Sequence, residues 1–314
     1  MIEGLGRLIN DIMIITNMKK IFCLIVILGI SLTLFGQKKD KLPIPIGEKL
    51  AKINADLDSI LKEAYHLYLS ETINWMASDN YMERGIYPPA KGSYVMFEDS
   101  IAKVLFVADN DLCVYEERYH LASKTRDYLT ERRALSETEK QFCDRQVRLM
   151  GKLTESGMQV YAYPEDQASF NIDVIRINDS ITRIYLILGA LANNLIPFGN
   201  DFSFDFDNND SLIASREYHH SYIPISWENS QTIEHVTHSH TKDNPYITPT
   251  DICTFVLYGY ELYGIQNLSV YSSALHQYFL FNPKDWNITM ITTDELLKQN
   301  DSSKKNHKKN HKKK

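Results

Sequence analysis

The sequence predicts an α+β fold, in which a helical region with a small sheet precedes a mainly antiparallel sheet. Apolar residues recur with helical spacing over residues 47–78, whereas apolar and polar residues alternate over most of the chain after residue 165. The hydrophobic content of 44% is sufficient for a buried core, so the chain is expected to be globular.

The N-terminal segment has the pattern of a secretory signal. In residues 18–37 (MKKIFCLIVILGISLTLFGQ), a lysine pair precedes fifteen mostly apolar residues and then Gly36. Fifteen residues are short for a membrane span, which needs about 20, although a short N-terminal anchor is the alternative. We therefore expect residues 1–36 to be a signal peptide with an N-terminal extension before Met18. The mature protein would be secreted, periplasmic or in the cell envelope, without a transmembrane span.

The region 37–165 is predicted to combine two helices with a small sheet. After a short linker, helical spacing predicts a long amphipathic helix over 47–78. Residues 92–120 alternate and contain two turns, so two or three antiparallel strands are expected there. A second helix over 136–155 begins with a capping box, in which Ser136 caps the helix and Glu139 reaches back.

The region 166–295 is predicted to be mostly strands, with one helix over 249–263. The remainder, 296–314, ends in a low-complexity Lys/His-rich tail that is expected to be disordered. The expected strands cover residues 171–179, 181–190, 201–210, 211–226, 232–240, 267–273, 276–282 and 287–292.

Charge and cysteine content exclude several classes of protein. The net charge is −6 although the tail alone carries seven lysines, so the body is strongly acidic and a nucleic-acid partner is not expected. Outside the signal segment there are three cysteines, Cys113, Cys143 and Cys253, and no close Cys-x-x-Cys pair. A disulfide scaffold and a cysteine-type zinc site are therefore not expected.

The stretch EHVTHSHTKDNPYITPTDICTFVLYG, residues 234–259, carries the strongest candidate site. If residues 232–240 form a strand, His238 and His240 lie on one face, because side chains alternate along a strand. Two such imidazoles can converge on one zinc ion, and Asp251 from the following helix would supply a third ligand.

Asp251 also has an ordinary structural explanation. Thr248 is a good N-cap, Pro249 suits the first helical position, and Asp251 then falls at the third. A carboxylate there is favoured by the helix dipole without any metal. Spacing alone leaves both interpretations open.

The spacing resembles the JAB/MPN metalloprotease motif, in which His-x-His is followed by seven residues, Ser, two residues and Asp. Here His238-Ser239-His240 is followed by seven residues, Thr248, two residues and Asp251. The predicted helix and two strands after Asp251 also resemble that fold, over roughly residues 180–290. The segments PFGNDFSFDFDNND and TPTDICTFVLYG resemble secreted proteins of the Bacteroidota phylum.

The resemblance implies a zinc site with His238, His240 and Asp251 as ligands and Thr248 as the oxyanion donor. It also implies a general base from an earlier strand, acting through metal-bound water. Glu217, on the predicted strand before the histidines, is the candidate base; His219 on the same face could instead bind metal or replace the base. The chain departs from the family in having Thr241 where Pro is common.

Two functions are therefore expected from the sequence. One is an exported zinc-dependent hydrolase that cleaves an amide or isopeptide bond in a peptide, protein or cell-wall-derived substrate. The other is an exported, non-catalytic binding or structural protein with a degenerate metal site. The position of a carboxylate near the histidine pair distinguishes them.

Overall fold

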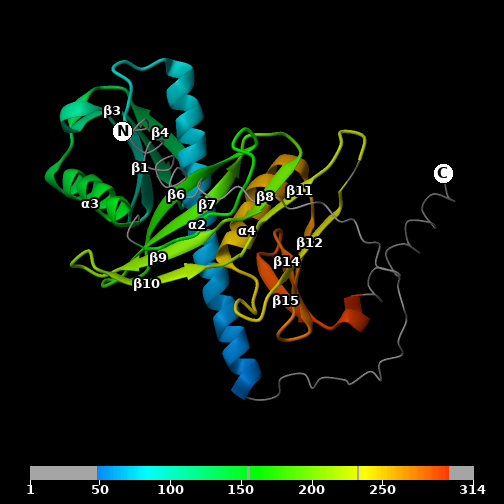
Figure 1. The fold of residues 1–314 in the computed structure, drawn as a ribbon. Helices are drawn as coiled ribbons and strands as arrows, with labels where there is room; N and C mark the ends of the chain where they lie inside the picture. Colours follow the sequence, from blue (N-terminus) through cyan, green and yellow to red (C-terminus); the bar gives the residue numbers. More distant parts are fainter. Residues whose placement is uncertain (1–47, 154–155, 232, 297–314) are drawn as a thin grey trace, which may run out of the picture.

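The computed structural model describes residues 48–153, 156–231 and 233–296 (Figure 1). The fold is α+β with mostly antiparallel sheets, as the sequence predicted. The expected signal segment and the Lys/His-rich tail lie outside the described residues. Within the described part of the chain, no helix combines the length and the apolar character that crossing a membrane requires.

The long helix α2 (Glu48–Arg84) connects the two predicted regions. It has 37 residues and is therefore about 55 Å long. Its first half packs into the core of the C-terminal part through side chains such as Leu57 and Leu67. Its second half packs against the N-terminal sheet through Ile73 and Ala77. The helix runs past the predicted end at residue 78, and Gly85 follows its last residue with a positive φ of 56°.

The N-terminal sheet contains three strands within residues 92–120, where two or three were expected, and two more strands after them. Strands β1 to β4 pair in chain order as antiparallel neighbours, and β5 pairs with β3. The five strands are β1 (Gly92–Glu98), β2 (Ile101–Val107), β3 (Leu112–His120), β4 (Thr125–Leu129) and β5 (Arg133–Ala134).

Helix α3 (Glu137–Leu153) begins with the predicted capping box. The Ser136 N–H donates to Glu139 Oε2 at 2.9 Å, and the Glu139 N–H donates to Ser136 Oγ at 3.3 Å. Leu149 and Leu153 of this helix pack on the central sheet.

The central sheet has the antiparallel order β10-β9-β7-β6 and is covered on both faces around β7. Ile184 and Leu186 pack against α3, whereas Tyr185 and Ile187 belong to the core that contains α2 and the C-terminal helix. This alternation follows from the two-residue period of a strand. The four strands are β6 (Ala168–Arg176), β7 (Thr182–Ala190), β9 (Phe202–Phe206) and β10 (Leu212–Glu217).

The C-terminal part consists of a two-stranded ribbon and a four-stranded sheet, which lie beside the first half of α2 (Figure 1). In the sheet, β12 pairs with β13 in parallel, while the other neighbours are antiparallel. The ribbon is β8 (Leu195–Gly199) with β11 (Tyr222–Ser226), and the sheet is β12 (His235–His240), β13 (Asn267–Ser272), β14 (Gln277–Asn282) and β15 (Asn287–Ile291).

The helix expected over 249–263 begins at Pro249 as predicted but changes its winding. Helix α4 (Pro249–Phe255) continues as the wider π-helical segment η2 (Val256–Glu261). The crossover from β12 through α4 and η2 to β13 joins the parallel pair, as parallel strands require.

Candidate metal centre

Four side chains converge at the N-terminal end of α4: His219, His238, His240 and Asp251. One donor atom from each lies within 4.8 Å of the others. The close pairs of imidazole Nε2 atoms and Asp251 carboxylate oxygens are 2.9–3.3 Å apart. The three ligands expected from the sequence therefore come together, and His219 joins them.

Local structure explains how each side chain reaches the cluster. His238 and His240 are two residues apart on β12, so they point to the same face. Asp251 lies in the first turn of α4. His219 lies in the bend between β10 and β11, where the side-chain amide of Asn244 donates to the carbonyl oxygens of Glu217 and Tyr218, both at 2.9 Å.

The two interpretations of Asp251 are compatible, because its two oxygens have different partners. Oδ2 accepts hydrogen bonds from the N–H and the hydroxyl of Thr248, both at 2.8 Å, and the Asp251 N–H donates back to Thr248 Oγ1 at 3.1 Å. This is the helix cap. Oδ1 is buried, accepts no hydrogen bond of good geometry, and lies 2.9 Å from His238 Nε2 and 3.3 Å from His219 Nε2.

Two of the imidazoles are oriented by acceptors behind them. His219 Nδ1 lies 2.7 Å from Asp201 Oδ1, and His240 Nδ1 lies 2.6 Å from the carbonyl oxygen of Tyr246. Both partners accept, so both Nδ1 atoms carry a proton, and in a neutral ring the Nε2 atom would present its lone pair to a metal. A hydrogen bond from the distant nitrogen is also how metal-bound histidines are usually fixed.

Imidazole nitrogens and carboxylate oxygens crowd the centre of the cluster. The Nε2 atoms of His219 and His240 are only 2.9 Å apart, and Asp251 adds carboxylate oxygens to the same space. With neutral imidazoles, Asp201 and Asp251 leave two negative charges, and only histidines pair with these carboxylates among the described residues. A divalent cation would balance both charges and separate the lone pairs.

The pKa shifts agree with a site built for positive charge. Burial disfavours the charged form of His219, but Asp201 and Asp251 outweigh it and raise the pKa of this imidazole well above its usual value. Burial also opposes the charge on Asp251, yet the three imidazoles hold the pKa of its carboxyl well below the usual range. Burial lowers the pKa of His238, so this ring favours the neutral form that binds metals.

The cluster is closed to solvent. The exposed fractions of the four side chains are 4% for His219, 3% for His238 and 0% for His240 and Asp251. Bonds of about 2.0–2.2 Å to zinc place tetrahedral ligands about 3.3–3.6 Å apart, close to the separations seen here. Three imidazole nitrogens and one carboxylate oxygen could therefore hold one metal ion.

Glu217 and Thr248, the two residues expected to act in catalysis, lie outside the set of four converging donors. Glu217 Oε1 lies 3.0 Å from His220 Nδ1, and the Glu217 side chain is 27% exposed. The Thr248 hydroxyl is buried, but it is engaged in the α4 cap with Asp251.

Sequence reasoning missed the groups that support the ligands. Asp201, in the turn between β8 and β9, accepts from both His219 and the Thr250 hydroxyl. The turn needs Gly199, whose φ is +85°, because a Cβ there would lie 2.0 Å from the carbonyl oxygen of Ser221. Gly199 is thus a visible sequence signal, but it does not reveal which distant segment it contacts.

Comparison with known proteins adds no family to this description. No protein-family profile, curated protein or solved structure matches the chain. The function must therefore be argued from the geometry of the site.

Proposed function

We propose that His219, His238, His240 and Asp251 bind one zinc ion, and that the protein is an exported, non-catalytic binding protein which this ion stabilises. The observation that carries the proposal is the closed sphere of four protein donors, each with a side chain no more than 4% exposed. Structural zinc sites have four protein ligands, whereas catalytic sites keep a position for water or substrate.

Zinc is the metal that suits the donor set. Nitrogen donors from histidine favour a transition metal over calcium or magnesium, which prefer all-oxygen sites. The ion would connect the β10–β11 bend, strand β12 and the first turn of α4. When bound, it would supply folding free energy, because the ligands could not hold this arrangement as well without it.

The zinc hydrolase expected from the His-x-His spacing is the second candidate. The spacing itself and the Thr248 hydroxyl beside Asp251 support it. Against it stand the fourth ligand His219, the closed site and the position of Glu217 beside His220. Hydrolysis would require one protein ligand to leave and a base to approach from elsewhere.

Metal analysis of protein without residues 297–314 tests the proposal, because this truncation removes the tail histidines. We expect one zinc per chain in the wild type and in His220→Ala, and no bound zinc in His219→Ala. The neighbouring His220 is a matched control, since it lies outside the cluster. Melting temperature should fall on chelation in the wild type and stay unchanged on chelation of His219→Ala.

Two results would contradict this function. Full zinc retention by His219→Ala with unchanged chelator sensitivity would show a three-ligand site with an open position. Zinc-dependent cleavage of a peptide or isopeptide substrate that is lost in His240→Ala but kept in His220→Ala would establish the hydrolase instead.

A further inference from the structure

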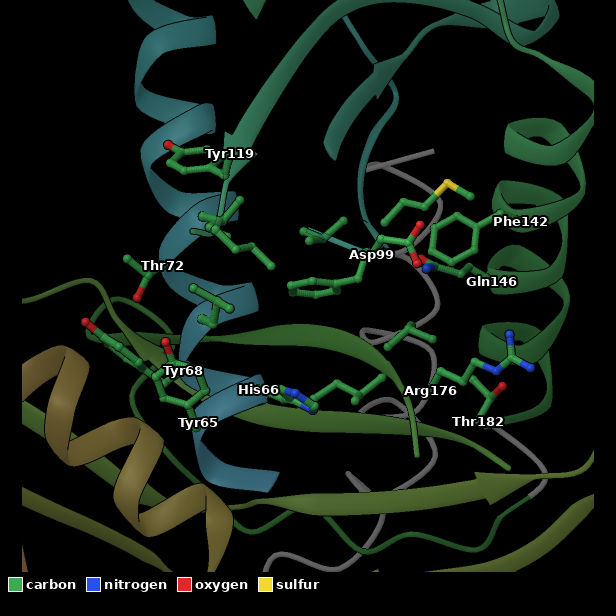
Figure 2. Close-up of a pocket in the computed structure, with 18 of the residues that line it drawn as sticks. Tyr65, His66, Tyr68, Thr72, Asp99, Tyr119, Phe142, Gln146, Arg176 and Thr182 are labelled. Atoms are coloured by element: carbon green, nitrogen blue, oxygen red, sulfur yellow. The ribbon is translucent and has the colours of Figure 1, made fainter. Parts of the chain in front are cut away.

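A large cavity lies between the second half of α2 and helix α3, away from the metal centre. Its volume is about 960 Å³, within the range of sites for small molecules, and none of the four cluster residues lines it. Figure 2 shows its walls: Tyr65, Tyr68 and Thr72 come from α2, and Phe142 and Gln146 come from α3. Val174 and Ile175 of β6 also line it.

The wall is mainly apolar, and part of it is exposed. Tyr65 is 46% exposed, Phe97 40% and Met76 38%, although all three are large apolar side chains. A group of neighbouring, exposed, large apolar side chains is more typical of a binding groove than of ordinary protein surface. Covering these side chains with an apolar ligand would be favourable.

Gln146 adds a polar side chain to this wall. The residue is 8% exposed and lines the cavity. A ligand that carries a hydrogen-bonding group could pair with its amide.

The charged groups at the cavity indicate the sign of that group. Lys124, Arg145 and Arg176 line it, with His66 and His120, whereas Asp99 is the one acidic residue among its described lining residues. The whole chain has the opposite balance, with a net charge of −6. Arg145 and Arg176 pair with Asp210 and Asp179, but Lys124 has no ion-pair partner in the described part of the chain.

We propose that this cavity binds an amphipathic carboxylate of the fatty-acid type. The aliphatic chain would lie against the apolar side chains of α2, β1 and α3. The carboxylate head would lie at the polar part of the wall, where Gln146 and the cationic side chains can donate to it. This site gives the binding protein a ligand class and does not depend on the metal centre.

Binding of three twelve-carbon compounds to the full zinc-loaded chain tests both parts of the proposal. Dodecanoate, dodecanol and dodecylamine share the chain and differ in the charge of the head group. By isothermal titration below the micelle concentration, we expect dodecanoate to bind tightest and dodecylamine weakest. Lys124→Glu should weaken dodecanoate several-fold and leave dodecanol unchanged, whereas Lys242→Glu, outside the cavity, should change neither.

A second variant places the aliphatic chain. Phe97→Glu should weaken all three compounds by at least about tenfold, because it puts a charge on the apolar wall; tenfold corresponds to about 1.4 kcal/mol. Ile213→Glu is the matched control, since Ile213 is 52% exposed on β10 and lies outside the cavity. Absence of dodecanoate binding, a preference for dodecylamine, or unchanged binding by Phe97→Glu would overturn the proposal. Binding of an apolar peptide in place of dodecanoate would assign the cavity to peptides and overturn it equally.

Discussion

The N-terminal sheet and the C-terminal metal centre both bury carboxylates, but they balance the charge in opposite ways. Glu116 and Glu117 on β3 are each 1% exposed, and Glu139 on α3 is 4% exposed. Arg133 pairs with both Glu116 and Glu139, and further cations face each carboxylate. In the C-terminal cluster, the ion-pair partners of Asp201 and Asp251 among the described residues are all imidazoles.

The difference separates a network balanced by fixed cations from one whose positive charge would come from protonated imidazoles or from the proposed metal ion. A guanidinium keeps its charge at every physiological pH, so the β3 network is complete within the chain. A neutral imidazole presents a lone pair and cannot neutralise a carboxylate. Both regions bury acidic side chains, but they differ in what balances the negative charge. Three experiments test this difference.

The largest effect is expected from removing the metal. Chelation should lower the free energy of unfolding by about 4 kcal/mol if zinc is normally present at a thousand times its dissociation constant. Hydrogen exchange followed by mass spectrometry should show faster exchange in β12, the β10–β11 bend and α4. Hydrogen exchange in β2 and β3 should not change. Equal loss of protection in the N-terminal sheet and around the metal centre would contradict the expected difference between them.

The next effect concerns the β3 network. Arg133→Met should destabilise the protein by about 3 kcal/mol, measured by urea unfolding, because two buried carboxylates lose a partner. The value is at the lower end for such changes, since Arg118 still faces Glu116 and Lys103 still faces Glu139. Arg132→Met at the exposed neighbouring position is the control. A neutral outcome for Arg133→Met would show that the network contributes little.

A third pair of buried acids has neither a guanidinium nor an imidazole partner among the residues that the structure describes. Asn171 donates to Glu71 Oε2 at 2.9 Å, and the Ser70 hydroxyl donates to Asp173 Oδ1 at 2.7 Å. Burial, with Asp173 nearby, raises the pKa of Glu71 from 4.5 to about 8. Burial likewise raises the pKa of Asp173 from 3.8 to about 7. Here protons replace the cation.

Per pH unit, the smallest effect follows from that pair. Between pH 4.5 and about 8 the unfolded chain has lost the Glu71 proton while the folded chain keeps it, so stability should fall as the pH rises. The slope contributed by each such proton is at most about 1.4 kcal/mol per pH unit. Glu71→Gln should therefore gain stability relative to the wild type as the pH rises to 8. Glu83→Gln, at an exposed position on the same helix, should show no such gain. If the difference in stability between Glu71→Gln and the wild type stayed constant across this pH range, the pKa of Glu71 would not be raised.

Most elements could be predicted because their signals are local. Apolar spacing indicated α2, alternation indicated the strands of both regions, and Thr248, Pro249 and Asp251 indicated the start of α4. Strand β8 (Leu195–Gly199) was missed, since all five of its residues are buried and it has no alternation to detect. The change from α4 to η2 was missed because the local sequence continues with helical spacing.

By itself the sequence determined which side chains could share one face. The two-residue period put His238 and His240 together, and the helix cap put Asp251 at a helix start. Only the tertiary structure decided what else reaches that place, because His219, Asp201 and the Tyr246 carbonyl come from separate turns. Contacts between turns depend on how whole sheets pack, and no short sequence pattern contains that information. For the same reason, Glu217 could be assigned to a strand but not to the side of the molecule that it faces.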